Sequence, residues 1–101
     1  MKDYVHQGDI LKIENIKTPV LAVSKDFFNR SEEIIGCPII TEGQAGALHI
    51  PINGKHISGF AHCEKLTLLD LKVRGFSRID SIPIEEIKDI TDAIQGIFDY
   101  I

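Results

Sequence analysis

The chain has 101 residues, two cysteines and a formal net charge of −4. This length is enough for one hydrophobic core, and two cysteines are too few for a disulfide framework, so we expect a single domain over 1–101. No stretch reaches membrane-spanning length and the start lacks the apolar segment of a secretory signal, so we expect a cytoplasmic protein with no membrane partner. The acidic excess falls within 83–101, while 1–82 hold ten acidic and ten basic residues. Charge therefore does not exclude a nucleic-acid partner.

The first part of the chain predicts a β-hairpin followed by a loop. Residues 8–14 largely alternate apolar and polar side chains, which is typical of a half-buried strand, and residues 19–24 form a second, β-rich apolar run. Only residues 15–17 separate Glu14 from Thr18, so the two strands should pair through a short connection. Residues 25–31 read as a loop.

The longest apolar run, 34–41, predicts the central strand of the fold. It is flanked by charged residues on both sides and ends on the hydroxyl of Thr41, so Thr41 should emerge from the core into solvent. Pro38 lacks an N–H and predicts a bulge or an unpaired position near that end. Cys37, in this run, and Cys63 are expected to be reduced core residues.

Three further strands are predicted over 47–52, 57–64 and 75–82. The first is followed by Asn53-Gly54, which is a strong hairpin signal. Residues 66–70 are compatible either with a continuation of the preceding strand or with a single helical turn.

The C-terminal segment differs from the rest of the chain, because its apolar residues recur at spacings of three and four. This predicts an amphipathic helix from about Pro83 to the end, packed by Ile87, Ile90, Ile94 and Ile97. The fold class is therefore mainly β with α: an SH3-like small barrel of about six short strands, closed by the helix.

The order of these segments and the residues within them resemble the MazF/PemK toxin family, whose SH3-like barrel ends in a C-terminal helix. The resemblance covers nearly the whole chain. Its matching segments are Tyr4-Val5, Gly8-Asp9-Ile10, Pro19 to Ser24, Phe28-Asn29, Cys37 to Thr41, Ser58-Gly59, Cys63-Glu64, Leu68-Leu69-Asp70, Lys72-Val73-Arg74 and Ile82 to Ile87.

The resemblance implies a sequence-specific, metal-independent endoribonuclease that cuts single-stranded RNA, works as a homodimer and is inhibited by a cognate antitoxin. It implies no cofactor. In the family, a Thr at the position of Thr41 and an Arg immediately before the Pro of the second strand carry most of the chemistry. Here Thr18 stands before Pro19, and the long loop that precedes this Arg in the family is shortened. The site is therefore degenerate, with Thr41 and Lys17 as its catalytic candidates.

Lys72, Arg74 and Thr18 are the RNA-binding candidates. The first two fall in the segment where the family has basic residues around its RNA surface. The four histidines show no pair at helical metal spacing and there is no Cys-x-x-Cys, so no metal site is expected.

Two other functions remain open. A catalytically inactive relative would keep the fold and a partner-binding groove and act as a binding or regulatory module. A gyrase poison of the CcdB kind is the third alternative, because residues 93–101 resemble the C-terminus of that sister family, with Asp99-Tyr100 in place of its Trp-Gly.

Overall fold

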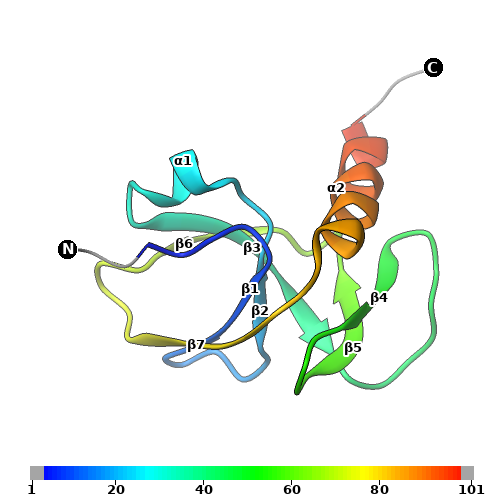
Figure 1. Cartoon of the computed structure of the whole chain (residues 1–101), viewed down its shortest axis with the longest axis horizontal. Coiled ribbons are helices and arrows are strands. Elements are labelled where there is room, and N and C mark those ends of the chain that lie inside the picture. The colour runs from blue at the N-terminus through cyan, green and yellow to red at the C-terminus, as the bar shows by residue number, and fades with distance from the viewer. Residues whose placement is uncertain (1–3, 99–101) are drawn as a thin grey trace.

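Seven strands and two helices make up the computed structural model, which describes residues 4–98 (Figure 1). In chain order they are β1 (Asp9–Ile13), β2 (Val20–Ala22), α1 (Asp26–Asn29), β3 (Glu33–Ile40), β4 (His49–Asn53), β5 (Ser58–His62), β6 (Thr67–Asp70), β7 (Phe76–Ser81) and α2 (Ile84–Phe98). The predicted class is confirmed: an antiparallel sheet curls into a half-barrel and carries a C-terminal helix. Residues 67–70, left open by the sequence, form the additional strand. In the described part of the chain, no helix has the length and apolar character needed to cross a membrane.

Strand β3 is the centre of the sheet. The strand order is β4-β5-β3-β2-β1-β7, with β6 also paired to β3. One edge of β3 pairs with β2 through residues 36–38. The other edge is shared, because residues 33–36 pair with β6 and residues 39–40 pair with β5. Pro38 lies in the interval between β6 and β5, so the unpaired position predicted from its missing N–H is confirmed on that edge.

Two glycines permit this crowding around β3. A Cβ on Gly36 would lie 2.6 Å from Val20 Cγ1 of β2, and one on Gly59 of β5 would lie 2.6 Å from the Ile40 carbonyl oxygen. Real Cβ atoms do not approach this closely, so both strands come near β3 only because a side chain is missing.

The apolar residues form a cluster on each face of the sheet. Ile10 and Leu21 belong to the cluster beneath α2, whereas Leu11 and Val20 belong to the opposite cluster. Strands β1 and β2 are therefore buried on both faces. The prediction of a half-buried first strand was wrong on this point, because Ile10 interrupts the alternation and is fully buried.

Helix α2 covers only one part of the sheet. Ile87 and Ile90 are buried and Ile94 packs against the core, as predicted. Ile97 is 41% exposed and Phe98 is 74% exposed, so the prediction that Ile97 packs into the core was wrong. The last turn of α2 points away from the sheet in Figure 1, which leaves these side chains without cover.

The segment expected to be a loop contains the four-residue helix α1. Its buried Asn29 donates to the carbonyl oxygens of Val5 and Ser24, at 2.9 and 3.0 Å, and thereby ties α1 to the N-terminal segment and to the residues that follow β2. A single helical turn of this kind has no apolar period that a sequence pattern could reveal.

Both cysteines are free and buried, as expected of core residues. Burial raises the pKa of the Cys37 thiol to about 12 and that of Cys63 to about 11. Both side chains are therefore neutral thiols at physiological pH.

Asp80 of β7 binds the turn of the β4–β5 hairpin. Its carboxylate accepts hydrogen bonds from the backbone N–H groups of Lys55, His56 and Ile57 at 2.7 to 3.1 Å, and also from that of Ser81. The partial burial of Asp80 acts to raise its pKa, but the four donors outweigh burial and lower the pKa to about 2. One carboxylate thus connects edge strand β7 with the turn between β4 and β5.

We expect Asp80→Asn to lower the free energy of unfolding by about 2 kcal/mol at neutral pH, because an amide cannot replace a charged acceptor of four N–H groups. The stabilisation is present above the ordinary pKa of 3.8 and is lost as the pH falls towards about 2. The free energies of unfolding of the wild type and Asp80→Asn, measured by urea denaturation, should therefore converge over that pH interval. Asp92→Asn on the exposed face of α2 is the matched control, and an equal effect of the two variants at neutral pH would contradict the role given to Asp80.

Candidate functional site

Thr41 follows the last residue of β3 and is exposed. The register of β2 against β3 pairs Val20 with Pro38, and the Ile39 N–H donates to the Pro19 carbonyl oxygen at 2.9 Å. The pairing thus continues past the end of β2 towards the residues that precede Pro19.

Extending this register sets Thr18 opposite Ile40 and Lys17 opposite Thr41. The pairing is observed as far as Pro19 and Ile39, and from its continuation we expect three of the predicted site residues to approach one corner, where the end of β3 meets the β1–β2 connection. Thr41 and Lys17 are exposed, while Thr18 is half-buried. A hydroxyl and an ammonium at one open corner could hold an anionic group such as a phosphate.

A small cavity of about 230 Å³ lies beside Thr18, and Lys65 and Thr67 also line it. Lys65 is a second cation of this region that sequence reasoning missed. It lies in the turn between β5 and β6, where no periodicity marks a residue. The only available signal was its place directly after Cys63-Glu64, one of the segments that carry the family resemblance.

Lys72 and Arg74 are not brought to this corner. They lie in the connection between β6 and β7, and β6 ends at Asp70, which pairs with Glu33 at the opposite end of β3 from Thr41. In Figure 1 this connection lies at the left of the molecule, well separated from the end of β3. Both side chains are exposed, and their assignment to RNA remains a prediction.

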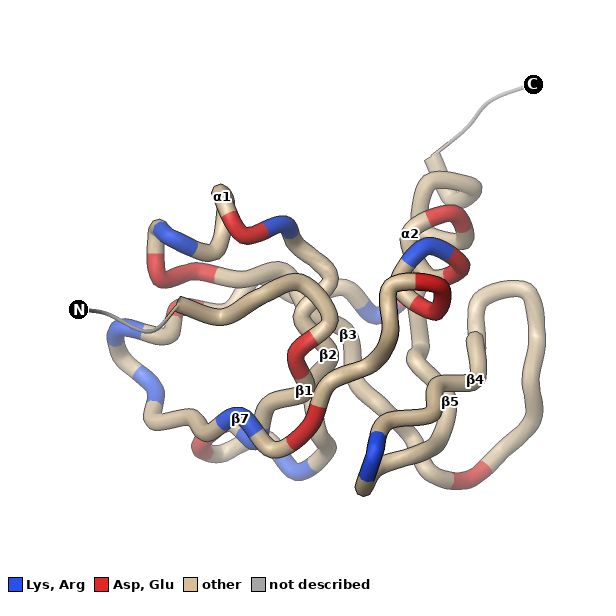
Figure 2. The backbone as a smooth tube through the Cα atoms, viewed as in Figure 1, with Lys and Arg blue, Asp and Glu red and all other residues tan. Residues whose placement is uncertain are grey.

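The basic residues within 4–98 are not gathered on one element. Figure 2 shows Lys and Arg at the two ends of α1, in the β6–β7 connection and on the strands β1 and β7, with acidic residues between them. Arg78 is engaged structurally: its Nε donates to Asp9 Oδ2 at 2.7 Å and its Nη2 to the Tyr4 carbonyl oxygen at 2.9 Å. Asp9 is 6% exposed, so this ion pair belongs to the fold.

A histidine cluster that the sequence did not predict lies on the β4–β5 hairpin. The rings of His49 and His62 stack with centroids 3.7 Å apart, and His49 Nε2 lies 2.9 Å from Glu64 Oε2. Burial, together with His49, lowers the pKa of His62. The hydrogen bond from His49 lowers the pKa of Glu64. The three residues are 13 and 2 positions apart, a spacing that becomes meaningful only once the hairpin register is known.

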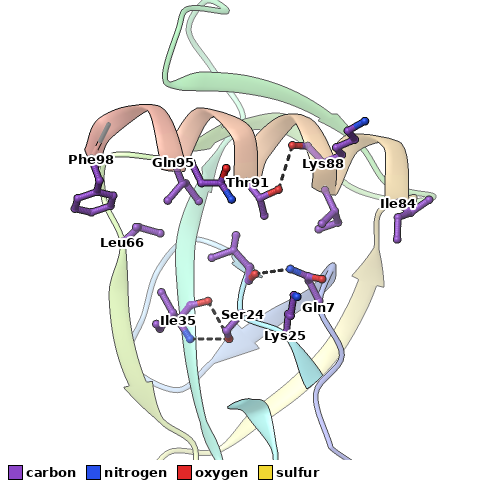
Figure 3. Close-up of a pocket in the computed structure, with 13 residues that line it drawn as sticks. Gln7, Ser24, Lys25, Ile35, Leu66, Ile84, Lys88, Thr91, Gln95 and Phe98 are labelled. Carbon is purple, nitrogen blue, oxygen red and sulfur yellow. Dashed lines mark hydrogen bonds between the residues drawn. The ribbon is translucent and has the colours of Figure 1, made fainter. Parts of the chain in front are cut away.

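A groove of about 720 Å³ lies between α2 and the sheet (Figure 3). Gln7, Ser24 and Ile35 lie on its sheet side, and Thr91 and Phe98 lie on α2. The polar groups of the sheet side are occupied, since Gln7 Nε2 donates to the Val23 carbonyl oxygen at 2.8 Å and Ser24 Oγ accepts from the Ile35 N–H at 2.9 Å. What the groove offers a partner is therefore mainly apolar surface.

Comparisons with known structures identify relatives of the same fold. A MazE-MazF complex from Deinococcus radiodurans matches with a TM-score of 0.85 and 14% identity, covering 96% of this chain and 98% of that chain. An endoribonuclease from a mycobacterial species matches with a TM-score of 0.82 and 12% identity, covering 95% of this chain and 92% of that chain. The Mycobacterium tuberculosis toxin MazF-mt6 matches with a TM-score of 0.69 and 17% identity, covering 97% of this chain and 100% of that chain.

Comparison with curated proteins gives no match. The sequence itself, however, matches over residues 7–98 the family model described as the PemK-like, MazF-like toxin of type II toxin-antitoxin systems. The matched range includes Thr41, the residues of the β1–β2 connection and all of α2. The chain therefore belongs to the PemK-like, MazF-like toxin family.

Proposed function

We propose that the protein is the toxin of a type II toxin-antitoxin system and acts in the cytoplasm as an endoribonuclease on single-stranded RNA. The family match over residues 7–98 carries this proposal. Two of the structural relatives agree with it, because one is described as a mycobacterial endoribonuclease and another as a mycobacterial endoribonuclease in complex with its cognate antitoxin.

In the proposed reaction the corner formed by Thr41, Lys17 and Thr18 receives the scissile phosphate. Cleavage requires the RNA 2′-hydroxyl to lose its proton, the leaving 5′-oxygen to gain one, and fixed donors to stabilise the charge that develops on phosphorus. The Thr41 hydroxyl is a hydrogen-bond donor and acceptor at the phosphate, and the ammonium of Lys17 offsets part of the charge. No metal takes part in this scheme, so cleavage should persist in EDTA.

This site is degenerate. The position before Pro19 holds Thr18 instead of an arginine, and removal of one such donor typically costs about 100–1,000-fold in rate. Lys65, which lines the cavity beside Thr18, is a second cation besides Lys17 that could offset the charge there. An ammonium is a point charge and lacks the two parallel donors of a guanidinium, so the substitution is partial.

Thr41→Val should abolish cleavage of single-stranded RNA, because it removes the hydroxyl while nearly keeping the side-chain volume. The purified protein and the variant are compared on end-labelled RNA, with thermal denaturation measured in parallel. The melting temperature should hardly change, since Thr41 is exposed. Thr91→Val on α2 is the matched control and should cleave like the wild type. Equal cleavage by wild type and Thr41→Val would remove Thr41 from the site.

Thr18→Arg should raise the cleavage rate about tenfold or more, equivalent to about 1.4 kcal/mol of transition-state stabilisation. The new guanidinium would lie beside Pro19 and donate to the phosphate charge. The rate is measured under single-turnover conditions. If both Thr18→Arg and Thr41→Val leave cleavage unchanged, or if no RNA is cut at all, the corner is not a ribonuclease centre and the binding-module alternative replaces it. The CcdB-like alternative depends on Asp99-Tyr100, which lie outside the described residues.

We further propose two partners, a cognate antitoxin and a second copy of the chain. Exposed apolar surface supports both: Ile84, Ile97 and Phe98 of α2 are 76%, 41% and 74% exposed, and the first and last of them line the groove of Figure 3. Ile101, which would continue this stripe, lies outside the described residues.

Light scattering at micromolar concentration should give about twice the chain mass of 11.3 kDa. Phe98→Ser should weaken self-association at least about tenfold, because it removes a large apolar side chain from the contact. Phe27→Ser is the matched control, since Phe27 is 72% exposed but lies on α1. A wild-type protein that remains monomeric under these conditions would contradict the dimer.

A further inference from the structure

The β4–β5 hairpin concentrates two imidazoles and a carboxylate on one side of the sheet. His49 and His62 are direct partners in the antiparallel register, and Glu64 follows two residues after His62. One possible ligand atom from each of the three residues lies within 4.8 Å of the other two. Strand pairing fixes the backbone of both histidines, so the cluster is held together by the sheet rather than by chance proximity of mobile chains.

One nitrogen in this cluster has no partner. His62 Nδ1 is shielded from solvent and makes no hydrogen bond, and it is the only buried side-chain nitrogen or oxygen of the described residues in that condition. A buried polar atom without a partner typically costs about 1–3 kcal/mol. Such an atom in a native structure calls for an explanation, of which an ion is one.

We propose that His49, His62 and Glu64 form a binding site for a divalent transition-metal ion, with Zn²⁺ as the best match. Two neutral imidazoles and one carboxylate are a typical ligand set for zinc, leaving a fourth position for water. Mg²⁺ and Ca²⁺ prefer oxygen ligands and fit this set poorly. The site goes beyond the proposed function: the β3–β5 register sets His62 opposite Pro38, three residues before Thr41, and no cleavage step depends on it.

Binding requires a modest rearrangement of side chains. The ring planes of His49 and His62 lie 7° from parallel, so their in-plane lone pairs do not converge as the rings stand. Two nitrogens on one tetrahedral zinc lie about 3.3 Å apart, given bond lengths of about 2.05 Å. Rotation of the rings about their χ angles can achieve this, because the side chains of His49 and Glu64 are 36% and 38% exposed and have room to turn. The ion would take the place of the proton shared by His49 and Glu64.

The test is calorimetric titration of untagged, EDTA-treated protein with ZnCl₂ and, separately, with MgCl₂. We expect one Zn²⁺ per chain at micromolar affinity or better, no binding of Mg²⁺, and a rise in melting temperature with Zn²⁺. Co²⁺ should give the visible absorption of a tetrahedral site. His49→Gln, His62→Gln and Glu64→Gln should each weaken binding at least about tenfold.

His56→Gln is the matched control. His56 is exposed in the turn of the same hairpin and only its backbone N–H contacts Asp80, so this variant should bind Zn²⁺ like the wild type. Circular dichroism establishes that each variant is folded, and Glu64→Gln keeps the test decisive if a histidine variant unfolds, because Glu64 is exposed. Absence of Zn²⁺ binding to the wild type, binding that survives all three ligand variants, or an equal loss in His56→Gln would overturn the proposal.

Discussion

The shared edge of β3 is the constraint on which the rest of the molecule depends. One strand of eight residues pairs with β2 on one side and with both β6 and β5 on the other, and the change from β6 to β5 occurs across Cys37 and Pro38. A proline is suited to this interval because it has no N–H to leave unpaired. Gly36 and Gly59 let the neighbouring strands approach. The sheet can therefore curl at this point, which gives α2 a concave surface to cover.

The candidate site follows from the same constraint. Because β2 pairs with β3 in a fixed register, we expect the residue after the end of β3 and the residues before Pro19 to meet at one corner. The histidine cluster has an equivalent origin in the register of β4 against β5. Both sites are thus products of strand pairing, in which residues distant in sequence are brought together by the backbone.

The sequence predicted most of the elements because their apolar patterns are strong. The runs around β1 to β5 and the spacing of isoleucines in α2 each indicate one type of structure, and Pro38 and Thr41 were located correctly at the end of the central strand. Three features were missed for physical reasons. The single turn of α1 is held by the side chain of Asn29, which no pattern indicates. Lys65 lies in an irregular turn, and the pairing of His49 with His62 depends on a register that the sequence does not specify.

The contact of Asp80 with the β4–β5 turn has a consequence for local opening of the protein. The hairpin joins the remainder of the sheet through only two residue pairs of β3 and β5, supplemented by Asp80 and by the hydrogen bond from the Asn53 N–H to Glu86 Oε1 at 2.7 Å. Strands β1 and β7 are joined through five residue pairs, and β3 and β6 through four. Amide hydrogens of β4 and β5 should therefore exchange with solvent through a separate, lower-energy opening, in which the hairpin separates from β3 while the pairs of β1 with β7 and of β3 with β6 stay protected.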